Sequence, residues 1–327
     1  MPTRNGGKET PQFLPTYKRN KNIFQFAVAK SALVCRIYIE TSMMIKPTIT
    51  YGSIYPQPFP PAWASAWGDD DFGLWAEFFV GEGEQAIVQR MRWIVPGQFL
   101  MGSPDTEQGR DLDEGPQHRV TISHGFWLAD TACTQAMWKA VMGNSPSKFD
   151  NYGRGNAEYP VESVSWNAVQ KFMQKLETQL PACKASLPTE AEWEYACRAG
   201  STTPFSFGAT ISADVVNYRG DAYGVGKKDS FSRHTVAVKG LPANEWGLYQ
   251  MHGNVWEWCA DGKREYTEND VIDPGLSLLP ATGDMLILRG GSWLSDKLRS
   301  RSAIRCQVRR DVLRHDSGFR LLLRSSS

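Results

Sequence analysis

The chain has 327 residues, of which 41% are hydrophobic and 12% aromatic, and its formal net charge is +1. This length and composition suit a globular protein of one large or two modest domains with a sizeable core. A net charge so close to zero argues against a protein that coats nucleic acid. The 12 tryptophans, 29 glycines and 19 prolines favour a loop-rich fold held together by large aromatic side chains.

The first segment, residues 1–43, is basic at its start and then briefly apolar. Its apolar run, residues 23–34, contains Lys30 and is too short to span a bilayer. Basic residues precede this run and no clear A-x-A-like cleavage site follows it, so an uncleaved signal sequence and export are the alternative. We expect a disordered or spurious extension, a true start at Met43 or Met44, and a cytoplasmic protein without a membrane span.

Residues 44–85 are rich in proline and then in aromatic side chains, which recur without a regular period. The irregular aromatic positions are Trp63, Trp67, Phe72, Trp75 and Phe78. We expect an N-terminal arm that these side chains hold against the core. A separate peptide-binding module is the alternative.

Residues 86–327 carry the signals of a folded domain. The run 86–99 alternates like a strand and ends in a Pro-Gly turn, and residues 119–122 and 126–128 predict two more strands around a glycine-containing turn. A short helix is predicted between Thr134, a suitable N-cap, and Gly143.

Two further helices are predicted from their caps. Ser165 precedes a helix whose apolar residues share one face, which indicates core packing rather than a cofactor site. That face consists of Trp166, Val169, Phe172, Met173 and Leu176. Thr189 and Glu192 form a capping box for the next helix, and Gly200 is the expected residue after its end.

The cysteines and histidines form no recognisable metal or disulfide pattern. The six cysteines lack a CxxC pair, so we interpret them as mostly buried apolar side chains in a reducing compartment. The five histidines include no HxxxH or HxE pair. We expect His252 to be a satisfied structural histidine, and the alternative is a pocket residue.

Seven spaced motifs occur in order between residues 93 and 323. They read PGQFLMGSP (96–104), EGPQHRVTI (114–122), PVESVSWNAVQKF (160–172), LPTEAEWEYACRAG (187–200), GNVWEW (253–258), RGGSW (289–293) and GFR (318–320). As an ordered set they resemble the sulfatase-modifying-factor family, whose founding activity is formylglycine generation. The resemblance implies an α+β, variant C-type-lectin fold that is loop-rich, with short helices and small twisted antiparallel sheets.

The resemblance also implies an oxidase that binds copper(I) through two cysteine thiolates, which are soft ligands for a soft ion. The positions of those two cysteines correspond here to Ser295 and Ser300. A serine hydroxyl is a hard ligand that stays protonated, so we expect no copper and no oxidase activity. The alternative is an active oxidase that converts a cysteine of a sulfatase-type protein, or other chemistry in a pocket of Ser292, Trp256 and Cys306.

Two calcium sites are implied by the same resemblance. The first would consist of Asn217, Tyr218, Asp229 and Phe231, which supply side-chain and carbonyl oxygens. The second would consist of Gln250, Gly253, Val255 and Glu257. Because Gln250 is neutral and longer than the usual Asn or Asp, we expect structural calcium at the first site and a weakened second site.

The C-terminal segment, residues 289–320, contains nine cations and three anions. Arg289, Arg301, Arg305 and Arg320 match the family's fixed arginines and are expected to pair with acids or carbonyls in the core. Glycines and apolar residues on either side should be buried as a framework. These framework residues are Gly290, Gly291, Ser292, Trp293, Gly318 and Phe319.

The remaining positions of this segment lie where the family varies, a pattern that resembles the lectin-type variable proteins of diversity-generating retroelements, although ordinary divergence gives the same appearance. The resemblance implies a bacterial, monomeric protein that presents these positions to a protein or peptide ligand. The predicted binding face consists of Leu294, Ser295, Asp296, Lys297, Ile304, Gln307, Val308, Arg309, Val312, Arg314, His315 and Ser317.

Overall fold

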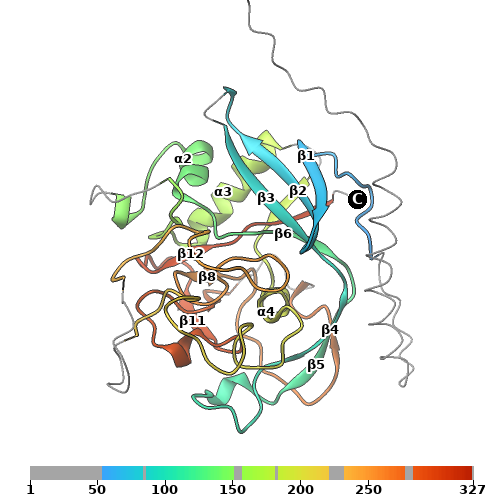
Figure 1. Cartoon of the computed structure of the whole chain (residues 1–327), viewed down its shortest axis with the longest axis vertical. Coiled ribbons are helices and arrows are strands. Elements are labelled where there is room, and N and C mark those ends of the chain that lie inside the picture. The colour runs from blue at the N-terminus through green and yellow to red at the C-terminus, as the bar shows by residue number, and fades with distance from the viewer. Residues whose placement is uncertain are drawn as a thin grey trace, which may run out of the picture. The chain divides into compact units, whose positions relative to one another are not determined.

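The computed structural model describes residues 54–83, 86–150, 157–180, 183–220, 232–276 and 283–325. The predicted N-terminal extension, residues 1–43, lies outside these ranges. Within them, the strands form three sheets of six, four and three strands. Short helices and long ordered loops connect the sheets, as expected for a loop-rich α+β fold (Figure 1).

The largest sheet has the strand order β1-β2-β3-β6-β13-β7, and all neighbouring strands in it are antiparallel. Its strands are β1 (Ala66–Asp70), β2 (Gly73–Val80), β3 (Ile87–Ile94), β6 (Phe126–Ala129), β13 (Leu322–Ser325) and β7 (Cys183–Ser186). The last strand in sequence, β13, therefore lies between β6 and β7, inside the sheet.

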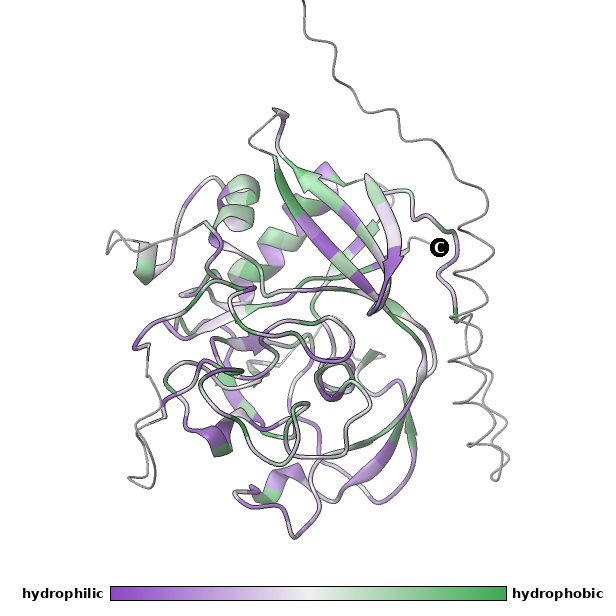
Figure 2. Ribbon diagram, in the orientation of Figure 1, coloured by the Kyte–Doolittle hydropathy of each residue, from purple (hydrophilic) through white to green (hydrophobic). Residues whose placement is uncertain are grey.

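The predicted N-terminal arm supplies two strands of this sheet. β2 pairs with β3 from Trp75 to Val80, and Ala76 and Phe78 are buried on the core face. Phe79 points the other way and is exposed. Figure 2 shows both hydrophobic and hydrophilic stretches along β2 and β3. The segment is therefore joined to the rest of the domain by backbone hydrogen bonds between β2 and β3.

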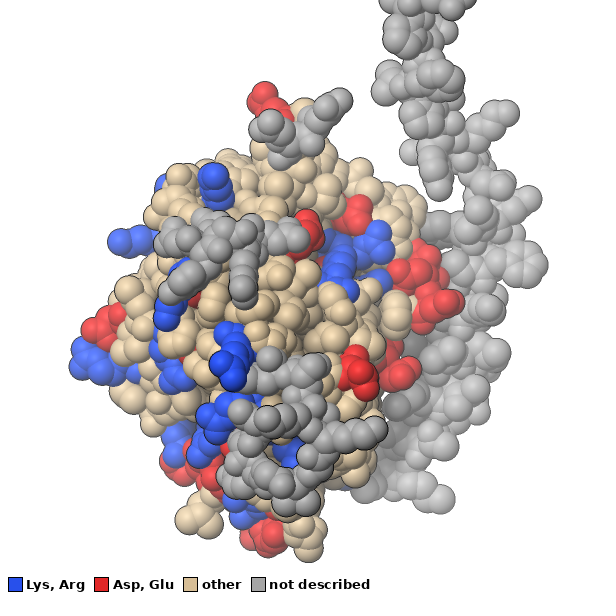
Figure 3. All heavy atoms as spheres, turned by 60° about the vertical axis from the view of Figure 1, so that its left-hand side comes forward, with Lys and Arg blue, Asp and Glu red and all other residues tan. Residues whose placement is uncertain are grey.

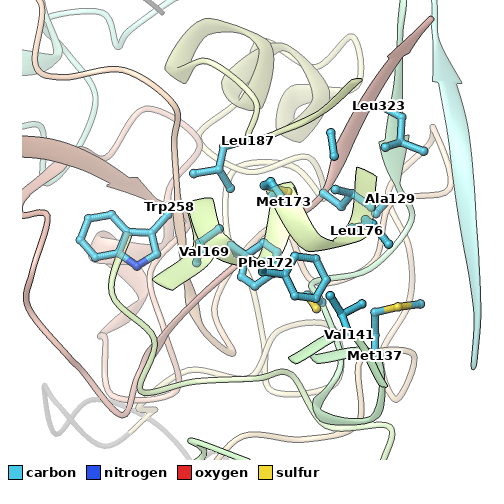
Figure 4. Packing of buried hydrophobic residues seen from close by; sticks show 14 of the residues in the cluster. Ala129, Met137, Val141, Val169, Phe172, Met173, Leu176, Leu187, Trp258 and Leu323 are labelled. Carbon is cyan, nitrogen blue, oxygen red and sulfur yellow. The ribbon is translucent and has the colours of Figure 1, made fainter. Parts of the chain in front are cut away.

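Helices α2 (Gln135–Met142) and α3 (Trp166–Gln179) form where their caps predict them. The Thr134 hydroxyl accepts a hydrogen bond from Met137 N, and the Ser165 hydroxyl accepts one from Ala168 N. Gly143 ends α2 in a left-handed conformation with φ 82°. The predicted apolar face of α3 is buried, and Figure 4 shows its side chains packed beside those of α2.

Helix α4 (Glu190–Arg198) begins with the predicted capping box between Thr189 and Glu192. All nine of its residues are buried. Two consecutive left-handed residues end it, Ala199 with φ 45° and the predicted Gly200 with φ 87°. The charged side chains of a fully buried helix need partners inside the protein. Glu190 and Glu194 of α4 pair with Arg305 and Arg289 of the C-terminal segment.

Five of the seven sequence motifs contribute residues to strands of the two smaller sheets. The four-stranded sheet has the order β11-β10-β8-β12, and the three-stranded sheet has the order β4-β5-β9. Their strands are β8 (Trp256–Trp258), β10 (Met285–Arg289), β11 (Cys306–Arg309), β12 (Ser317–Phe319), β4 (Gly97–Met101), β5 (His118–Ile122) and β9 (Val271–Ile272). The predicted strands near residues 119–122 and 126–128 both form, but β5 and β6 belong to different sheets.

Two apolar clusters cover opposite faces of the four-stranded sheet. Leu286 and Leu288 of β10 belong to the first cluster, whereas Ile287 between them belongs to the second. This alternation is the period of a strand that is buried on both faces. Among the described residues, no helix is long and apolar enough to cross a membrane.

Candidate functional site

The turn after β10 requires its two glycines. Gly290 and Gly291 have φ values of 95° and 76°, which disfavour any other residue. A Cβ on Gly290 would lie 2.9 Å from the Met251 carbonyl oxygen, and one on Gly291 would lie 2.5 Å from that of Arg299. The turn thus brings the GNVWEW loop and the C-terminal segment into backbone contact. The predicted framework is confirmed, because its six residues are all buried.

Two of the four fixed arginines bind carboxylates of α4. Arg305 donates from Nε to Glu190 Oε1 at 2.6 Å and from Nη2 to Oε2 at 2.8 Å. Arg289 donates to Glu194 Oε2; burial by itself would lower the pKa of Arg289, but the Glu194 and Glu190 carboxylates raise it above its usual value. The expected pairing in the core is confirmed for both.

The other two fixed arginines hold loops. Arg301 donates to both oxygens of Glu114, at 2.7 and 2.6 Å, and to Glu107 Oε1 at 2.6 Å. Arg320 donates from Nη2 to Glu257 Oε1 at 2.8 Å. All four arginines are therefore neutralised internally and add no charge to a binding face.

The two positions that correspond to the copper-binding cysteines are engaged in local hydrogen bonds. Ser295 Oγ accepts a hydrogen bond from Ser292 N at 3.0 Å. Ser300 Oγ donates to the Asp296 carbonyl at 3.2 Å. Both hydroxyls stabilise the turn that contains them, and neither supplies a soft thiolate, so this donor set does not fit copper(I).

Cys306 and Cys259 do not form a substitute thiolate pair. Cys306 packs against the first apolar cluster, whereas Cys259 belongs to the second, so the sheet separates them. Burial raises the pKa of both thiols. The five described cysteines are all free, and four of them are buried, as predicted; Cys35 lies outside the described residues.

The predicted pocket of Ser292, Trp256 and Cys306 is only partly assembled. Asp316 links the first two, because its Oδ2 accepts from Ser292 Oγ at 3.1 Å and its carbonyl accepts from Trp256 N at 2.8 Å. Arg314 donates twice to the same carboxylate, at 2.9 and 3.0 Å. Cys306 lies on β11, at the other edge of the sheet from β12, yet Arg314 and Asp316 are near enough for their charges to affect the pKa of its thiol.

His252 is confirmed as a satisfied structural histidine. Its Nδ1 donates to the Ser300 carbonyl at 2.7 Å, and its Nε2 accepts from Ser206 N at 3.1 Å. Burial lowers the pKa of His252 to about 4. The neighbouring Cys197, 3.6 Å from Nε2, is buried as well, and burial raises its pKa to about 12. This pair therefore stays in the neutral thiol and imidazole forms.

The first predicted calcium set lies partly beyond the described residues, because Asp229 and Phe231 fall there. Of its other members, Asn217 accepts at Oδ1 from Ser232 Oγ at 2.9 Å and donates from Nδ2 to the His234 carbonyl at 3.1 Å. Its amide oxygen is therefore already engaged by the Ser232 hydroxyl.

The second predicted calcium set does not fit a cation in this arrangement. Both oxygens of Glu257 accept hydrogen bonds from Arg320, and Oε2 also accepts one from Trp193 Nε1 at 2.7 Å. Gln250 donates to the Ala237 carbonyl at 2.7 Å, and its Oε1 accepts from Asn254. The other two members of the set are the carbonyls of Gly253 and Val255. Its one carboxylate, that of Glu257, is therefore already paired with the Arg320 guanidinium.

The residues of the predicted binding face differ in their exposure to solvent. Its exposed members are Lys297, Gln307 and Arg309, and its half-buried members are Leu294, Asp296, Val308, Val312, Arg314 and His315. Figure 3 shows one face of the molecule, with more basic than acidic side chains over its left half. Part of the segment's charge is paired, since Arg309 binds Asp311 at 2.9 Å.

Three members of that predicted face are buried and must be removed from it. Ile304 belongs to the first apolar cluster. Ser317 pairs with Trp256 in the sheet, and Ser295 is turned toward Ser292. An aliphatic side chain gains from burial, and a small hydroxyl is buried at little cost when it finds a local partner.

A group of aromatic and imidazole rings lies beside this segment, and sequence reasoning found only two of its five members. Trp293 and His315 were predicted as framework and face, whereas Phe149, Tyr159 and His234 come from loops that carried no prediction. Phe149 lies 5.5 Å from Trp293, and His315 lies 5.7 Å from Trp293, between ring centroids. We call these five residues the ring patch.

Comparison with known proteins agrees with the motifs. The family described as Sulfatase-modifying factor enzyme 1-like domain matches residues 79–325. The formylglycine-generating enzyme of Streptomyces coelicolor is 33% identical over 166 residues, which cover 49% of this chain and 48% of that protein. Serine/threonine-protein kinase Pkn1 of Chlamydia trachomatis is 29% identical over 261 residues, and the chain spans only 38% of its length.

Among solved structures, Treponema denticola variable protein 1 superposes with a TM-score of 0.61 at 27% identity. The match covers 76% of this chain and 99% of that protein. The fold described above is thus shared with a protein whose name marks it as variable.

Proposed function

Because the chain belongs to the Sulfatase-modifying factor enzyme 1-like domain family, we propose that it binds a protein or peptide ligand through its C-terminal segment and catalyses no copper-dependent oxidation. One observation carries the second half of the proposal: serine hydroxyls at 295 and 300 stand where the family's oxidases have thiolates, and both are hydrogen-bonded within their own turn. Cys306 packs against the first apolar cluster, whereas Cys259, the partner considered for it, belongs to the second.

The likeness to Treponema denticola variable protein 1 supports the ligand-binding half. A buried framework of glycines, Trp293 and Phe319 holds a segment whose Lys297, Gln307 and Arg309 remain exposed. A rigid frame with exposed positions between its fixed points suits a displayed surface. Diversification of this segment by a retroelement would be supported by a reverse-transcriptase gene and a near-identical repeat beside the gene.

Copper binding and peptide oxidation test the catalytic half. The purified protein should bind no stoichiometric copper(I) and should leave a cysteine-containing sulfatase-type peptide unchanged. Ser295→Cys combined with Ser300→Cys should gain copper(I) binding, and either single substitution is the matched control. Tight one-to-one copper binding by the natural chain that Cys306→Ser abolishes would favour the second candidate, an active oxidase, which the 33% identity to a formylglycine-generating enzyme motivates.

Selection from a random 12-residue peptide library displayed on phage tests the binding half. Lys297→Glu combined with Gln307→Glu changes two exposed residues of the segment and should abolish binding of the selected peptides. Gln174→Glu combined with Lys175→Glu makes the same chemical change on the exposed side of α3 and should leave binding intact. Equal loss in both variants, or no loss in either, would contradict display by the C-terminal segment.

A further inference from the structure

Strand β11 lies at the edge of the four-stranded sheet, with β10 as the strand next to it. Ile287 of β10 lies opposite Gln307 of β11, but the backbone of Ile287 is bonded on the other side. Its N–H donates to the Asp261 carbonyl, and its carbonyl accepts from Cys259 N at 2.9 Å. Because backbone groups of successive residues in a strand point in opposite directions, those of Gln307 face away from β10.

The outward backbone groups of β11 are mostly unpaired. Arg309 lies opposite Met285, two residues before Ile287, so its backbone faces outward as well. Within the part of the chain that the structure describes, neither the N–H and carbonyl of Gln307 nor the N–H of Arg309 makes a hydrogen bond. The Arg309 carbonyl accepts one from Val312 N at 3.1 Å. The edge of β11 therefore offers two donors and one acceptor to an added strand.

Two other edge strands, β7 and β12, are closed by bonds within the protein. Ala185 N of β7 donates to Glu177 Oε1 at 2.9 Å. The Phe319 carbonyl of β12 accepts from Cys133 N at 2.8 Å. Proteins commonly cover strand edges in this way because an open edge invites pairing with another chain. An open edge inside the proposed ligand-binding segment therefore suits a peptide that pairs with it.

The two faces of β11 differ in polarity. Cys306 and Val308 are half-buried and pack against the first apolar cluster, whereas Gln307 and Arg309 are exposed on the other face. Side chains that lie directly opposite each other on paired strands share a face. An added strand would therefore place every second side chain beside the apolar cluster and the others beside Gln307 and Arg309. This arrangement fits an extended segment with alternating apolar and polar residues.

Charged side chains on β11 and around it balance, apart from the arginine–glutamate pairs buried in the core. The cations are Lys263, Lys297, Arg299, Arg309, Arg310 and Arg314, and the anions are Asp111, Asp113, Asp284, Asp296, Asp311 and Asp316. Several of these charges are already paired, such as Arg309 with Asp311 and Arg314 with Asp316. Net charge therefore gives no basis for selecting a ligand at this edge, and backbone hydrogen bonds with the side-chain pattern remain.

We propose that β11 binds the ligand by strand addition, in which an extended peptide with alternating apolar and polar side chains pairs antiparallel with Gln307 and Arg309. Strand addition draws its affinity from main-chain hydrogen bonds and its selectivity from every second side chain. β11 already pairs antiparallel with β10, and antiparallel pairing is slightly more stable per residue than parallel pairing. This inference rests on the proposed function and specifies the conformation and pattern of its ligand.

Fluorescence anisotropy with the full chain tests strand addition. The probe is fluorescein-labelled Ser-Val-Thr-Val-Thr-Val-Ser, and Ser-Val-Val-Val-Thr-Thr-Ser is a control of the same composition without alternation. In antiparallel pairing, the residue opposite Gln307 shares its polar face and turns its N–H toward it. N-methylation of both threonines should therefore weaken binding of the probe about tenfold or more, whereas N-methylation of two valines should leave it unchanged.

Three results with these peptides would overturn the inference. They are equal effects of the two methylated probes, equal binding of the control without alternation, and no binding of the probe up to millimolar concentration.

A proline substitution tests the location. Gln307→Pro removes the outward N–H and leaves the bonds between β11 and β10 in place, which an edge strand tolerates. It should weaken binding of the probe about tenfold, whereas Gln307→Ala keeps the N–H and should not. An equal effect of both variants would contradict pairing at this edge. Melting temperatures check folding, and the methylated probes decide if Gln307→Pro unfolds.

Peptides selected by phage display separate this inference from the proposed function. If they lose binding with the Lys297 and Gln307 double variant but tolerate N-methylation and Gln307→Pro, strand addition is excluded while the proposed function stands. If neither variant affects them, both are excluded. Sedimentation velocity tests a second copy of the chain as the occupant. Self-association that Gln307→Pro abolishes would assign the edge to that second copy and overturn peptide addition.

Discussion

Arg301 and Glu114 join two segments that lie far apart in the sequence, by a bidentate pair of hydrogen bonds at 2.7 and 2.6 Å. Neither side chain is accessible to solvent beyond 1%. This ion pair attaches the charged loop, residues 103–115, to the C-terminal segment that we propose to present a ligand surface. Leu298 of the same segment packs against Gly109 of the loop and adds a second contact between the two.

Arg301→Met should destabilise the protein by about 3–5 kcal/mol, because it leaves the Glu114 carboxylate buried without its cation. Urea unfolding followed by tryptophan fluorescence measures the loss. Arg301→Met combined with Glu114→Met should recover part of it, since no uncompensated charge remains. A double variant as unstable as the sum of both single variants would show that the pair is not coupled.

Asp261 predicts a pH dependence. Its Oδ1 accepts from Glu190 N at 2.7 Å, and burial, aided by the nearby Glu190 carboxylate, raises the pKa of Asp261 from 3.8 to about 7. The folded state therefore holds the proton more tightly than the unfolded state, so this contribution to stability is complete below pH 4 and lost as the pH rises to about 7.

Asp261→Asn keeps an oxygen acceptor and cannot lose a proton. It should raise the melting temperature relative to the natural chain at pH 8, and the gain should shrink toward pH 4. Each pKa unit corresponds to about 1.4 kcal/mol, so the difference should be on the order of a few kcal/mol. Calorimetry at pH 8 and pH 4 measures the melting temperatures. A gain of the same size at both pH values would refute the raised pKa of Asp261.

Gly290→Ala should destabilise the fold by about 1–3 kcal/mol, because its φ of 95° is strained for alanine and the new Cβ would lie 2.9 Å from the Met251 carbonyl oxygen. Gly283→Ala is the control, since a Cβ there meets nothing within 4 Å. Chemical denaturation of the two variants should differ accordingly. Similar midpoints would mean that the turn relaxes without cost.

Calcium should raise the melting temperature if the first predicted set, which includes Asn217 and Asp229, binds the ion only in the folded state. Asp229→Ala should remove this shift. Gln250→Ala should leave the shift unchanged, because the second set has its carboxylate bound to Arg320. A calcium shift that survives Asp229→Ala would eliminate the first site.

Local signals made the helices predictable. Thr134, Ser165 and Thr189 each cap a helix by a hydrogen bond to a residue three positions later, which depends only on neighbouring residues. The four fixed arginines were predictable from the motif positions. Their partners were not, since Glu190 and Arg305 are 115 residues apart.

Three features depend on tertiary structure and were not predicted from the sequence. In β2, Trp75 stacks under Arg90 on the outer face, so its aromatic side chains do not all point to the core and the alternation is hidden. The members of the ring patch come from five separate places, and only the fold brings them together. Burial of Ser295 and Ser317 was missed because both were assigned to the binding face as positions at which the family varies.

The interior position of β13 has a consequence for synthesis on the ribosome. Until residues 322–325 have been synthesised, β6 and β7 each have an unpaired edge, and the six-stranded sheet cannot be completed. Open edges invite pairing with other chains. The proposed ligand surface precedes β13 in the sequence. A chain truncated within that surface therefore also lacks β13 and exposes the edges of β6 and β7. Such truncated chains would be removed as misfolded protein and would not present the surface.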